Sequence, residues 1–247
     1  MKKEEKHHVI WENDEVQVNV PYSAAGVSTT IILTSKFTGK MMLLDVGDGA
    51  LRDLLFYTKS SDFVNEIDLI ALSHGHFDHV GGLHTLLGFM RMLRRKTPLN
   101  IIIPAESKEA IGIIKGFREY YHETLPFRIA HHETTQGSGF DTDFFKVKSF
   151  EVEHYSLENL APGDEEVLEP ALGYRVRIGN TTIAYTGDTR ECIGAELIVR
   201  DADLAIIEAT RKETPQSELR VHLSLEEAKN LGKLAKDYIL IHQIPDV

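Results

Sequence analysis

The chain has 247 residues, of which 42% are hydrophobic and 26% charged, and this suits one large α/β domain spanning residues 1–247. No apolar run approaches the roughly 18 residues of a membrane span, and the polar start lacks the apolar stretch of a signal peptide, so we expect a cytoplasmic protein with no membrane partner. The net charge of −11 disfavours a general nucleic-acid coat, and the single cysteine, Cys192, excludes an internal disulfide and a four-cysteine zinc site.

The first half of the chain predicts alternating strands and helices. Apolar and β-branched runs between turn-forming residues indicate strands, and apolar residues at helical spacing indicate helices. In chain order we expect strands at Val16–Val20, Thr30–Ser35 and Met41–Asp45, a helix at Leu51–Tyr57, a strand at Asp68–Leu72, a helix at Val80–Leu93, a strand at Leu99–Ile103, and a helix at Ser107–Gly116 that Ser107 caps and Gly116 ends.

The second half restarts this alternation. We expect strands at Phe144–Phe150, Glu151–His154, Tyr174–Ile178, Thr181–Tyr185, Leu204–Ile207 and Tyr238–Ile241, and a helix at Ser224–Ala235. Gly179-Asn180 suits a two-residue hairpin turn, and Ser224 with Glu227 suits a capping box. Two β-rich halves that each end in β/α units predict two packed sheets with helices outside.

The segment after the strand Asp68–Leu72 is dense in metal-ligand residue types. It places His74, His76, Asp78 and His79 within six positions, and Gly75 lets the backbone turn sharply between them. Imidazole nitrogens and carboxylate oxygens are the ligands that zinc and similar metals prefer. Four such residues on one loop splay apart too far for all of them to bind one ion, and they could serve two adjacent ions.

A two-ion site needs further ligands, and three candidates stand at or just after predicted strand ends. His154 closes one strand, Asp188 follows Thr181–Tyr185, and His242 follows Tyr238–Ile241. Any one of them alone would more often be structural. Together with the histidine-rich loop they form a coherent ligand set.

The pattern His-x-His-x-Asp-His, then His, then Gly-Asp-Thr and a late His, resembles the metallo-β-lactamase superfamily from Val16 to His242. The resemblance implies an α/β (α+β) fold, a four-layer αββα sandwich. It also implies two divalent ions, zinc first, with manganese or iron as alternatives. By the resemblance, one ion takes His74, His76 and His154, the other takes Asp78, His79 and His242, Asp188 bridges them, and Asp45 supports the ligands from behind.

Further segments resemble the ribonuclease Z-like branch of that superfamily. Asp45-Val46-Gly47-Asp48-Gly49 is similar to its Asp-Cys-Gly-Glu-Gly opening, and Leu172-Gly173-Tyr174-Arg175-Val176 is similar to its Gly-Tyr-Arg strand. Glu208-Ala209-Thr210 and His222-Leu223-Ser224 are similar to the segments in which a glutamate and a histidine cooperate.

Phosphodiester cleavage explains that pair. The reaction needs a hydroxide nucleophile, which two metals supply by lowering the pKa of a bridging water, and protonation of a poor alkoxide leaving group. His222, held and kept protonated by Glu208, is expected to be the general acid. The predicted catalytic set is therefore Asp78, Glu208 and His222.

Two departures from ribonuclease Z bear on the substrate. The long arm that grips tRNA is replaced by Gly179-Asn180, and an acidic insertion, Glu158–Pro170, would repel a polyanion. We therefore expect a small or cyclic phosphodiester, or an RNA 3′ region. Substrate-binding candidates are Arg190, Arg211 and Arg220. By analogy with the branch, a homodimer is expected.

Other activities use the same ligand set. A lactonase or thioesterase would leave Glu208 and His222 without a clear role. A mononuclear iron dioxygenase would bind one iron per chain in place of two ions. A non-catalytic relative would be expected to lose ligands, and all seven are present. The leading prediction is a dinuclear metal-dependent hydrolase, most specifically a phosphodiesterase.

Overall fold

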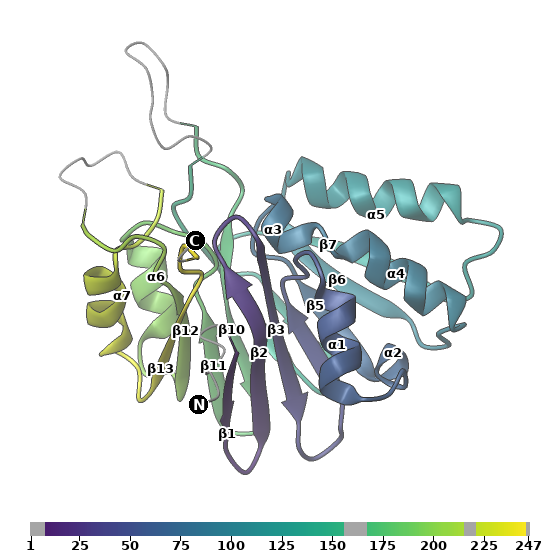
Figure 1. Ribbon diagram of the computed structural model, residues 1–247, viewed down its shortest axis with the longest axis horizontal. Coiled ribbons are helices and arrows are strands. Elements are labelled where there is room, and N and C mark those ends of the chain that lie inside the picture. The colour runs from purple at the N-terminus through teal and green to yellow at the C-terminus, as the bar shows by residue number, and fades with distance from the viewer. Residues whose placement is uncertain (1–7, 156–166, 215–220, 246–247) are drawn as a thin grey trace.

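The protein, seen here in a computed structural model that describes residues 8–155, 167–214 and 221–245, is built from two β-sheets lying face to face (Figure 1). Helices cover the outer surface of each sheet. This confirms the predicted four-layer αββα sandwich. Across the described residues, no helix combines the length and the apolar character needed to cross a bilayer.

The first sheet follows chain order, and within the described residues it holds seven strands. They are β1 (Val9–Glu12), β2 (Val16–Ala24), β3 (Ser28–Ser35), β4 (Met41–Leu44), β5 (Ile67–Ala71), β6 (Leu99–Pro104) and β7 (Ile129–Thr134). Strands β1 to β4 pair antiparallel, and β4 to β7 pair parallel. The parallel strands therefore all end at one edge of the sheet.

The second sheet has the order β13-β12-β11-β10-β9-β8 in the part of the chain that is described. Its strands are β8 (Gly139–Asp141), β9 (Lys146–Glu151), β10 (Leu172–Ile178), β11 (Thr181–Tyr185), β12 (Leu204–Glu208) and β13 (Tyr238–Ile241). Strands β8 to β11 pair antiparallel, and β11 to β13 pair parallel.

The described residues form seven helices. Their bounds are α1 (Ala50–Thr58), α2 (Phe63–Glu66), α3 (Phe77–Val80), α4 (Leu83–Met92), α5 (Lys108–Tyr120), α6 (Ile193–Val199) and α7 (Leu225–Gly232). Helices α1, α4 and α5 lie over the first sheet, and α6 and α7 lie over the second (Figure 1).

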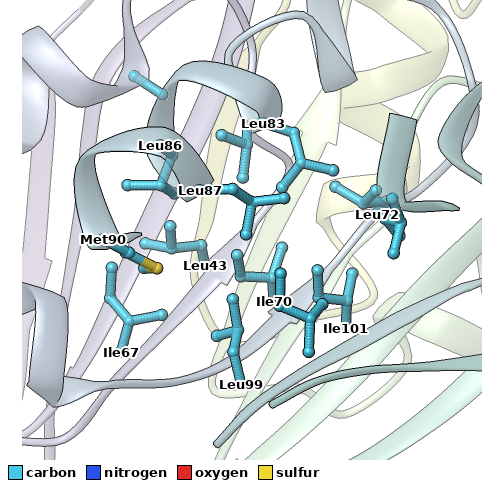
Figure 2. Packing of buried hydrophobic residues seen from close by; sticks show 14 of the residues in the cluster. Leu43, Ile67, Ile70, Leu72, Leu83, Leu86, Leu87, Met90, Leu99 and Ile101 are labelled. Atoms are coloured by element: carbon cyan, nitrogen blue, oxygen red, sulfur yellow. The ribbon is translucent and has the colours of Figure 1, made fainter. Parts of the chain in front are cut away.

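Three apolar layers hold this sandwich together, one between the sheets and one on the outer face of each sheet. Between the sheets, Leu33 and Leu44 of the first sheet share a fully buried cluster with Val176 and Ile206 of the second. Outside the first sheet, α4 packs its apolar face onto β4, β5 and β6 (Figure 2). Each fully buried leucine or isoleucine contributes roughly 1.5–3 kcal/mol. The same layers fix where the strand ends lie.

Two local predictions are confirmed in detail. The turn Gly179-Asn180 joins β10 to β11, with Ile178 directly opposite Thr181. The Ser224 side chain accepts a hydrogen bond from the backbone of Glu227, and the Glu227 side chain accepts one from the backbone of Ser224, so the capping box of α7 is complete.

The predicted helix Val80–Leu93 is wrong in its start. The chain instead forms the short helix α3, breaks at Gly81-Gly82 and begins α4 at Leu83. A Cβ atom on Gly82 would lie 2.1 Å from the carbonyl oxygen of Gly47, so the break allows two backbone segments to touch. The local sequence does not reveal that contact.

Other boundaries also differ from the prediction. Helix α5 runs through Gly116 to Tyr120, and the Ser107 side chain makes no capping hydrogen bond. Strand β9 ends at Glu151, so Val152 to His154 lie in a loop. The sequence prediction also missed β1, β7, β8, α2 and α6, which are short or carry polar residues at positions that pattern reasoning treats as loop.

Candidate metal centre

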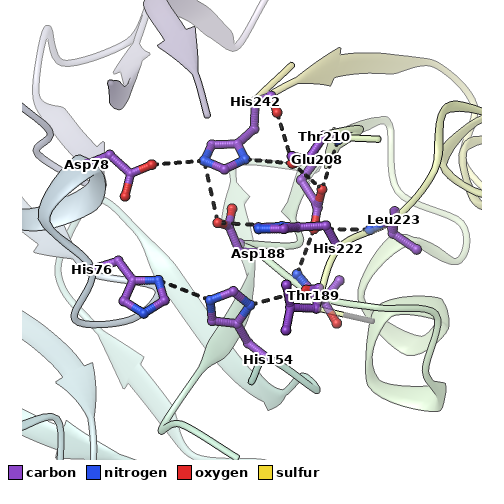
Figure 3. Close-up of polar contacts among 12 residues, drawn as sticks. His76, Asp78, His154, Asp188, Thr189, Glu208, Thr210, His222, Leu223 and His242 are labelled. Carbon is purple, nitrogen blue, oxygen red and sulfur yellow. Dashed lines mark hydrogen bonds and ion pairs between the residues drawn. The ribbon is translucent and has the colours of Figure 1, made fainter. Parts of the chain in front are cut away.

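The seven predicted ligands come together at one edge of the sandwich, where parallel strands of both sheets end. His74, His76, Asp78 and His79 follow β5, Asp188 follows β11, and His242 follows β13. His154 comes from the loop after β9. The carboxyl ends of parallel strands are the usual place for ligands in α/β folds. Figure 3 shows several of these side chains pointing toward one another.

One group consists of His74, His76 and His154, whose ligand atoms lie within 4.8 Å of one another. Nδ1 of His76 is 3.1 Å from Nε2 of His154. The His74 and His154 rings meet edge to face, with their centroids 4.7 Å apart. These three imidazoles present nitrogens to a common point, as the resemblance predicts for one ion.

A second group consists of Asp78, His79 and His242, again within 4.8 Å. Nε2 of His242 is 3.2 Å from Oδ2 of Asp78 and 3.2 Å from Nε2 of His79. Asp188 lies between the groups, because its Oδ2 is 3.4 Å from Nε2 of both His79 and His242 and 3.9 Å from Nε2 of His74.

Buried donor atoms at this centre lack the partners that protein interiors normally supply. Among the described residues, Nε2 of His74 and Oδ1 of Asp188 are buried without a hydrogen-bond partner. Buried polar atoms are almost always paired, so each such atom needs an explanation. Nitrogen and carboxylate donors converging on a shared point are the chemistry that divalent cations such as zinc require. The residues therefore fit the two ions.

The outer ring nitrogens of four histidines are all engaged. Nδ1 of His79 donates to Asp45 at 2.7 Å, and Nδ1 of His154 donates to the Val221 carbonyl at 3.2 Å. Nδ1 of His242 donates to the Thr210 hydroxyl at 2.8 Å, and Nδ1 of His74 donates to the Ser73 hydroxyl at 3.0 Å. Such bonds fix the ring orientation and leave Nε2 as the ligand atom.

Asp45 is the hub of this supporting layer. Its fully buried carboxylate accepts from the Ser73 backbone at 2.6 Å, from the Ser73 hydroxyl at 2.7 Å, from Nδ1 of His79 at 2.7 Å and from the Tyr185 hydroxyl at 2.5 Å. Its φ of 59° lies in the left-handed region, which costs energy for a residue with a side chain. This is the position behind the ligands that the family resemblance implies for Asp45.

Burial and neighbouring charges set the protonation of the ligands. Burial lowers the pKa of His154 to about 4, and burial together with nearby His79 lowers the pKa of His74 well below its ordinary value. Burial also acts to lower the pKa of His79, but the Asp188 and Asp45 carboxylates raise it well above normal. His74 and His154 are thus neutral at pH 7, as metal ligands must be.

Asp188 is ionised despite its burial. Burial alone would raise its pKa, but His242 and His79 hold the pKa well below its ordinary value. Asp78 behaves alike: burial raises its pKa, and the hydrogen bond from His242 and the charge of His79 bring it to about 2. Both carboxylates are therefore available as anionic ligands.

The Glu208–His222 pair lies beside this centre (Figure 3). Glu208 is fully buried, and its Oε1 accepts from Nδ1 of His222 at 2.9 Å and from the backbone of Thr189 at 3.0 Å. Its Oε2 accepts from the backbone and the hydroxyl of Thr210 at 3.1 and 2.8 Å. The contact with Glu208 therefore orients the His222 ring through Nδ1.

His222 is close enough to the metal ligands to allow another interpretation. Its Nδ1 is 3.9 Å from Oδ2 of Asp188, and His222, Asp188 and His242 also form a group within 4.8 Å. The shorter contact, 2.9 Å from Nδ1 to Oε1 of Glu208, favours a proton-transfer role over metal ligation.

The predicted substrate-binding arginines are Arg190, Arg211 and Arg220, and the structure describes the first two. The Arg190 side chain donates to Glu153 at 2.8 Å and to the Tyr155 hydroxyl at 2.7 Å, and its guanidinium lies over the Tyr155 ring. The backbone of Arg211 donates to the Leu223 carbonyl at 3.1 Å. Arg220, like residues 158–166 of the acidic insertion, falls outside the described residues. Substrate binding by these arginines stays a prediction.

Sequence reasoning missed the neutral groups that support the centre. Ser73, Tyr185 and Thr210 each contact a predicted ligand or its carboxylate partner. Ser73 and Thr210 are immediate sequence neighbours of the motif residues His74 and Ala209, and that adjacency is the available sequence signal. Tyr185, at the end of β11, gives no comparable signal.

A family model described as a beta-lactamase superfamily domain matches residues 42–242. The chain belongs to the β-lactamase superfamily. The match includes every predicted metal ligand together with Asp45, Glu208 and His222. With the buried histidine and aspartate groups, it makes the protein a metal-dependent hydrolase of this superfamily that binds divalent metal.

Curated relatives of this superfamily member include ribonuclease Z of Pyrococcus abyssi (strain GE5 / Orsay), which is 28% identical over 85% of the chain and 79% of the relative. Ribonuclease Z of Mycobacterium sp. (strain KMS) is also 28% identical, over 90% of the chain and 79% of the relative. The chain thus resembles ribonuclease Z over most of its length.

Solved structures share the fold. The short form of human tRNase Z matches with a TM-score of 0.71 and 23% identity over 92% of each chain. The metallo-β-lactamase-fold protein YhfI of Bacillus subtilis matches with a TM-score of 0.71 and 19% identity over 94% of this chain and 88% of that one. Both confirm the sandwich architecture predicted from the sequence.

Proposed function

We propose that this protein is a dinuclear phosphodiesterase that cleaves a small phosphodiester or the 3′ region of an RNA. The observation that carries the proposal is the hydrogen bond between Glu208 and His222 beside Asp188. An alkoxide is a strong base and a poor leaving group, so a hydrolase that expels one needs a proton donor at this place. The ribonuclease Z relatives support the same reaction class.

In this proposal the residues of the chain have two roles, holding the ions and orienting the ligand rings. His74, His76 and His154 would hold one divalent ion, Asp78, His79 and His242 the other, and Asp188 would contact both. When bound, two such ions, proposed to be zinc, activate water as a nucleophile and neutralise phosphate charge. The Asp45, Thr210 and Val221 contacts keep the ligand rings in orientation.

His222 would donate the proton to the departing oxygen. The Glu208 carboxylate accepts from Nδ1 and so orients the ring, and in this proposal the proton transferred is the one on Nε2. Five hydrogen bonds hold Glu208 itself, so the pair is rigid before a substrate arrives. Rigid placement lowers the entropic cost of proton transfer.

The β10–β11 hairpin supports a small substrate. Its two-residue turn, Gly179-Asn180, stands where ribonuclease Z enzymes carry their tRNA-gripping arm. By the resemblance, the arm is therefore missing at that place, which favours a substrate bound by contacts near the metal centre.

The leaving group gives the sharpest test. We would compare His222→Asn with wild type on bis-p-nitrophenyl phosphate, whose leaving group needs no proton, and on an RNA dinucleotide, whose leaving alkoxide does. General-acid loss should reduce kcat by about 10²–10⁴ on the dinucleotide and far less on the nitrophenyl ester. Metal content should stay at two ions per chain.

Three outcomes would contradict the proposal. Equal losses on both substrates would show that His222 does not act as the acid. A variant that loses an ion would make His222 a ligand. A wild-type protein that cleaves lactones or thioesters but neither phosphodiester, or that carries one iron per chain, would place it in another reaction class.

A further inference from the structure

A further carboxylate reaches the candidate metal centre from a segment outside the motifs that carry the family resemblance. Residues 167–170 lead into β10, and Glu169 lies among them. The Glu169 backbone donates to the His154 carbonyl at 2.9 Å, and Leu168 forms a bridge with Tyr155. The segment is therefore tied to the loop that carries a predicted ligand.

The Glu169 side chain contacts another predicted ligand of the same ion. Its Oε2 lies 3.0 Å from Nε2 of His76. The opposite nitrogen of that ring, Nδ1, is 3.1 Å from Nε2 of His154 and so faces the ligand group. His76 thus has one nitrogen toward the ion and the other on a carboxylate.

His76 needs such a partner more than the other histidines do. Its side chain is 35% exposed, whereas those of His74 and His79 are fully buried and that of His242 is 2% exposed. The core therefore fixes the other rings by packing, but His76 can rotate unless a hydrogen bond holds it. The other four histidines all have a partner on their outer nitrogen, and Glu169 completes that pattern for the fifth.

We propose that Glu169 is a positioning residue that accepts the Nε2 proton of His76 and thereby holds Nδ1 toward the ion shared with His74 and His154. The inference rests on the metal-ligand set of the proposed function. It assigns to Glu169 a direct contact with a ligand, in place of the repulsion of polyanions expected from its place in the acidic insertion.

The contact should contribute to metal affinity. Loss of a hydrogen-bond partner behind a ligating histidine typically weakens metal binding by about 10–100-fold. The loss should fall on one ion, because Glu169 contacts His76 directly and His154 only through its carbonyl. The ion held by Asp78, His79 and His242 should keep its affinity.

The test measures metal affinity directly. Zinc would be titrated against a chromogenic chelator into wild type, Glu169→Ala, Glu169→Gln and the control Glu106→Gln. Glu106 is exposed and lines the same cleft as Glu169. Among the contacts described for this structure, Glu106 has none with His76, so its variant measures the effect of removing one negative charge from the cleft. Cobalt(II) absorption spectra would report the geometry of each site.

We expect Glu169→Ala to weaken one of the two ions by about 10–100-fold and to change the cobalt spectrum of that ion only. Glu169→Gln keeps a carbonyl acceptor and should recover part of the affinity. Glu106→Gln and the thermal unfolding of the metal-free variants should match wild type.

Unchanged affinities for both ions in Glu169→Ala would overturn the proposal, as would equal weakening in Glu106→Gln or in both ions. Failure of the proposed function would look different. In that case wild type would bind fewer than two ions, or would bind two and cleave no phosphodiester, whatever residue stands at Glu169.

Discussion

Replacing Glu208 with glutamine tests the centre of the catalytic hypothesis, because glutamine keeps the shape of the side chain and removes only charge and one acceptor. In the protein, Oε1 accepts from the Thr189 and Leu223 backbones and from His222, and Oε2 accepts from the Thr210 backbone and hydroxyl. An amide nitrogen at either position faces at least one buried N–H group and cannot accept from it.

The magnitude follows from that geometry. The lower-cost orientation puts the amide nitrogen toward Thr210, where one backbone N–H loses its acceptor and the hydroxyl can turn toward the His242 carbonyl. An unsatisfied buried donor costs about 1–3 kcal/mol, and the remaining bonds lose their charge assistance. We therefore expect Glu208→Gln to lower the free energy of unfolding by roughly 2–4 kcal/mol.

The effect on catalysis should match that of removing His222. In that orientation the amide carbonyl still accepts from Nδ1, but the negative charge that would stabilise the protonated ring is gone, so kcat on an RNA dinucleotide should fall by about 10²–10⁴. Urea unfolding of the metal-loaded protein gives the stability, and steady-state kinetics give kcat. Glu119→Gln, on the exposed face of α5, is the matched control and should change neither.

A double variant decides whether the two residues act as a unit. If they do, Glu208→Gln combined with His222→Asn should lose little more activity than either change alone. Full additivity of the two losses, or a Glu208→Gln protein as stable and active as wild type, would refute the reasoning.

Three more predictions concern the surrounding structure. A Cβ on Gly47 would lie 2.3 Å from the carbonyl oxygen of Asp78, so Gly47→Ala should destabilise the protein by about 1–3 kcal/mol in urea unfolding, whereas Gly88→Ala, with open space around it, should stabilise it by roughly 0.5–1 kcal/mol. Because the pKa of His79 is raised, metal binding must displace the proton from this ring, and metal affinity should therefore fall as the pH decreases. Calorimetry in buffers of different ionisation enthalpy should detect the released proton. Equal binding heats in all buffers would contradict this prediction. Arg95 donates to the carbonyls of Thr97, Pro98, Ile67 and Val64, so Arg95→Met should cost about 3 kcal/mol or more of stability and leave metal content unchanged.

The sequence could predict the centre because its residue types are chemically specific. Histidines and aspartates at strand ends have few structural reasons to gather, and parallel strands bring their carboxyl ends to one edge. His74, Asp188 and His242 are distant in the chain yet their side chains meet, since β5, β11 and β13 end together. Residue chemistry and strand topology are therefore enough to place these side chains near one another.

Contacts between residues that are distant in the chain and carry no recognisable motif cannot be predicted from the sequence, for a physical reason. The Tyr185 hydroxyl reaches Asp45 across 140 residues, and no spacing rule links the two. At the Gly81-Gly82 break the backbone of Gly47 approaches closely, and the local sequence does not show that approach. Helical periodicity alone therefore predicts one continuous helix. Glu169 has the same character, because its role depends on which ring the side chain meets in the folded protein, and the sequence does not give that contact.

The net charge of −11 does not conflict with an anionic substrate, because the charge that matters is local. Two divalent ions would place four positive charges beside the carboxylates of Asp45, Asp78 and Asp188, so a phosphate bound there would meet cations directly. Surface charges farther than about 10 Å are screened at ordinary salt. The acidic surface therefore leaves binding of a single phosphate intact and acts on phosphates farther along a chain, which favours short substrates over long ones.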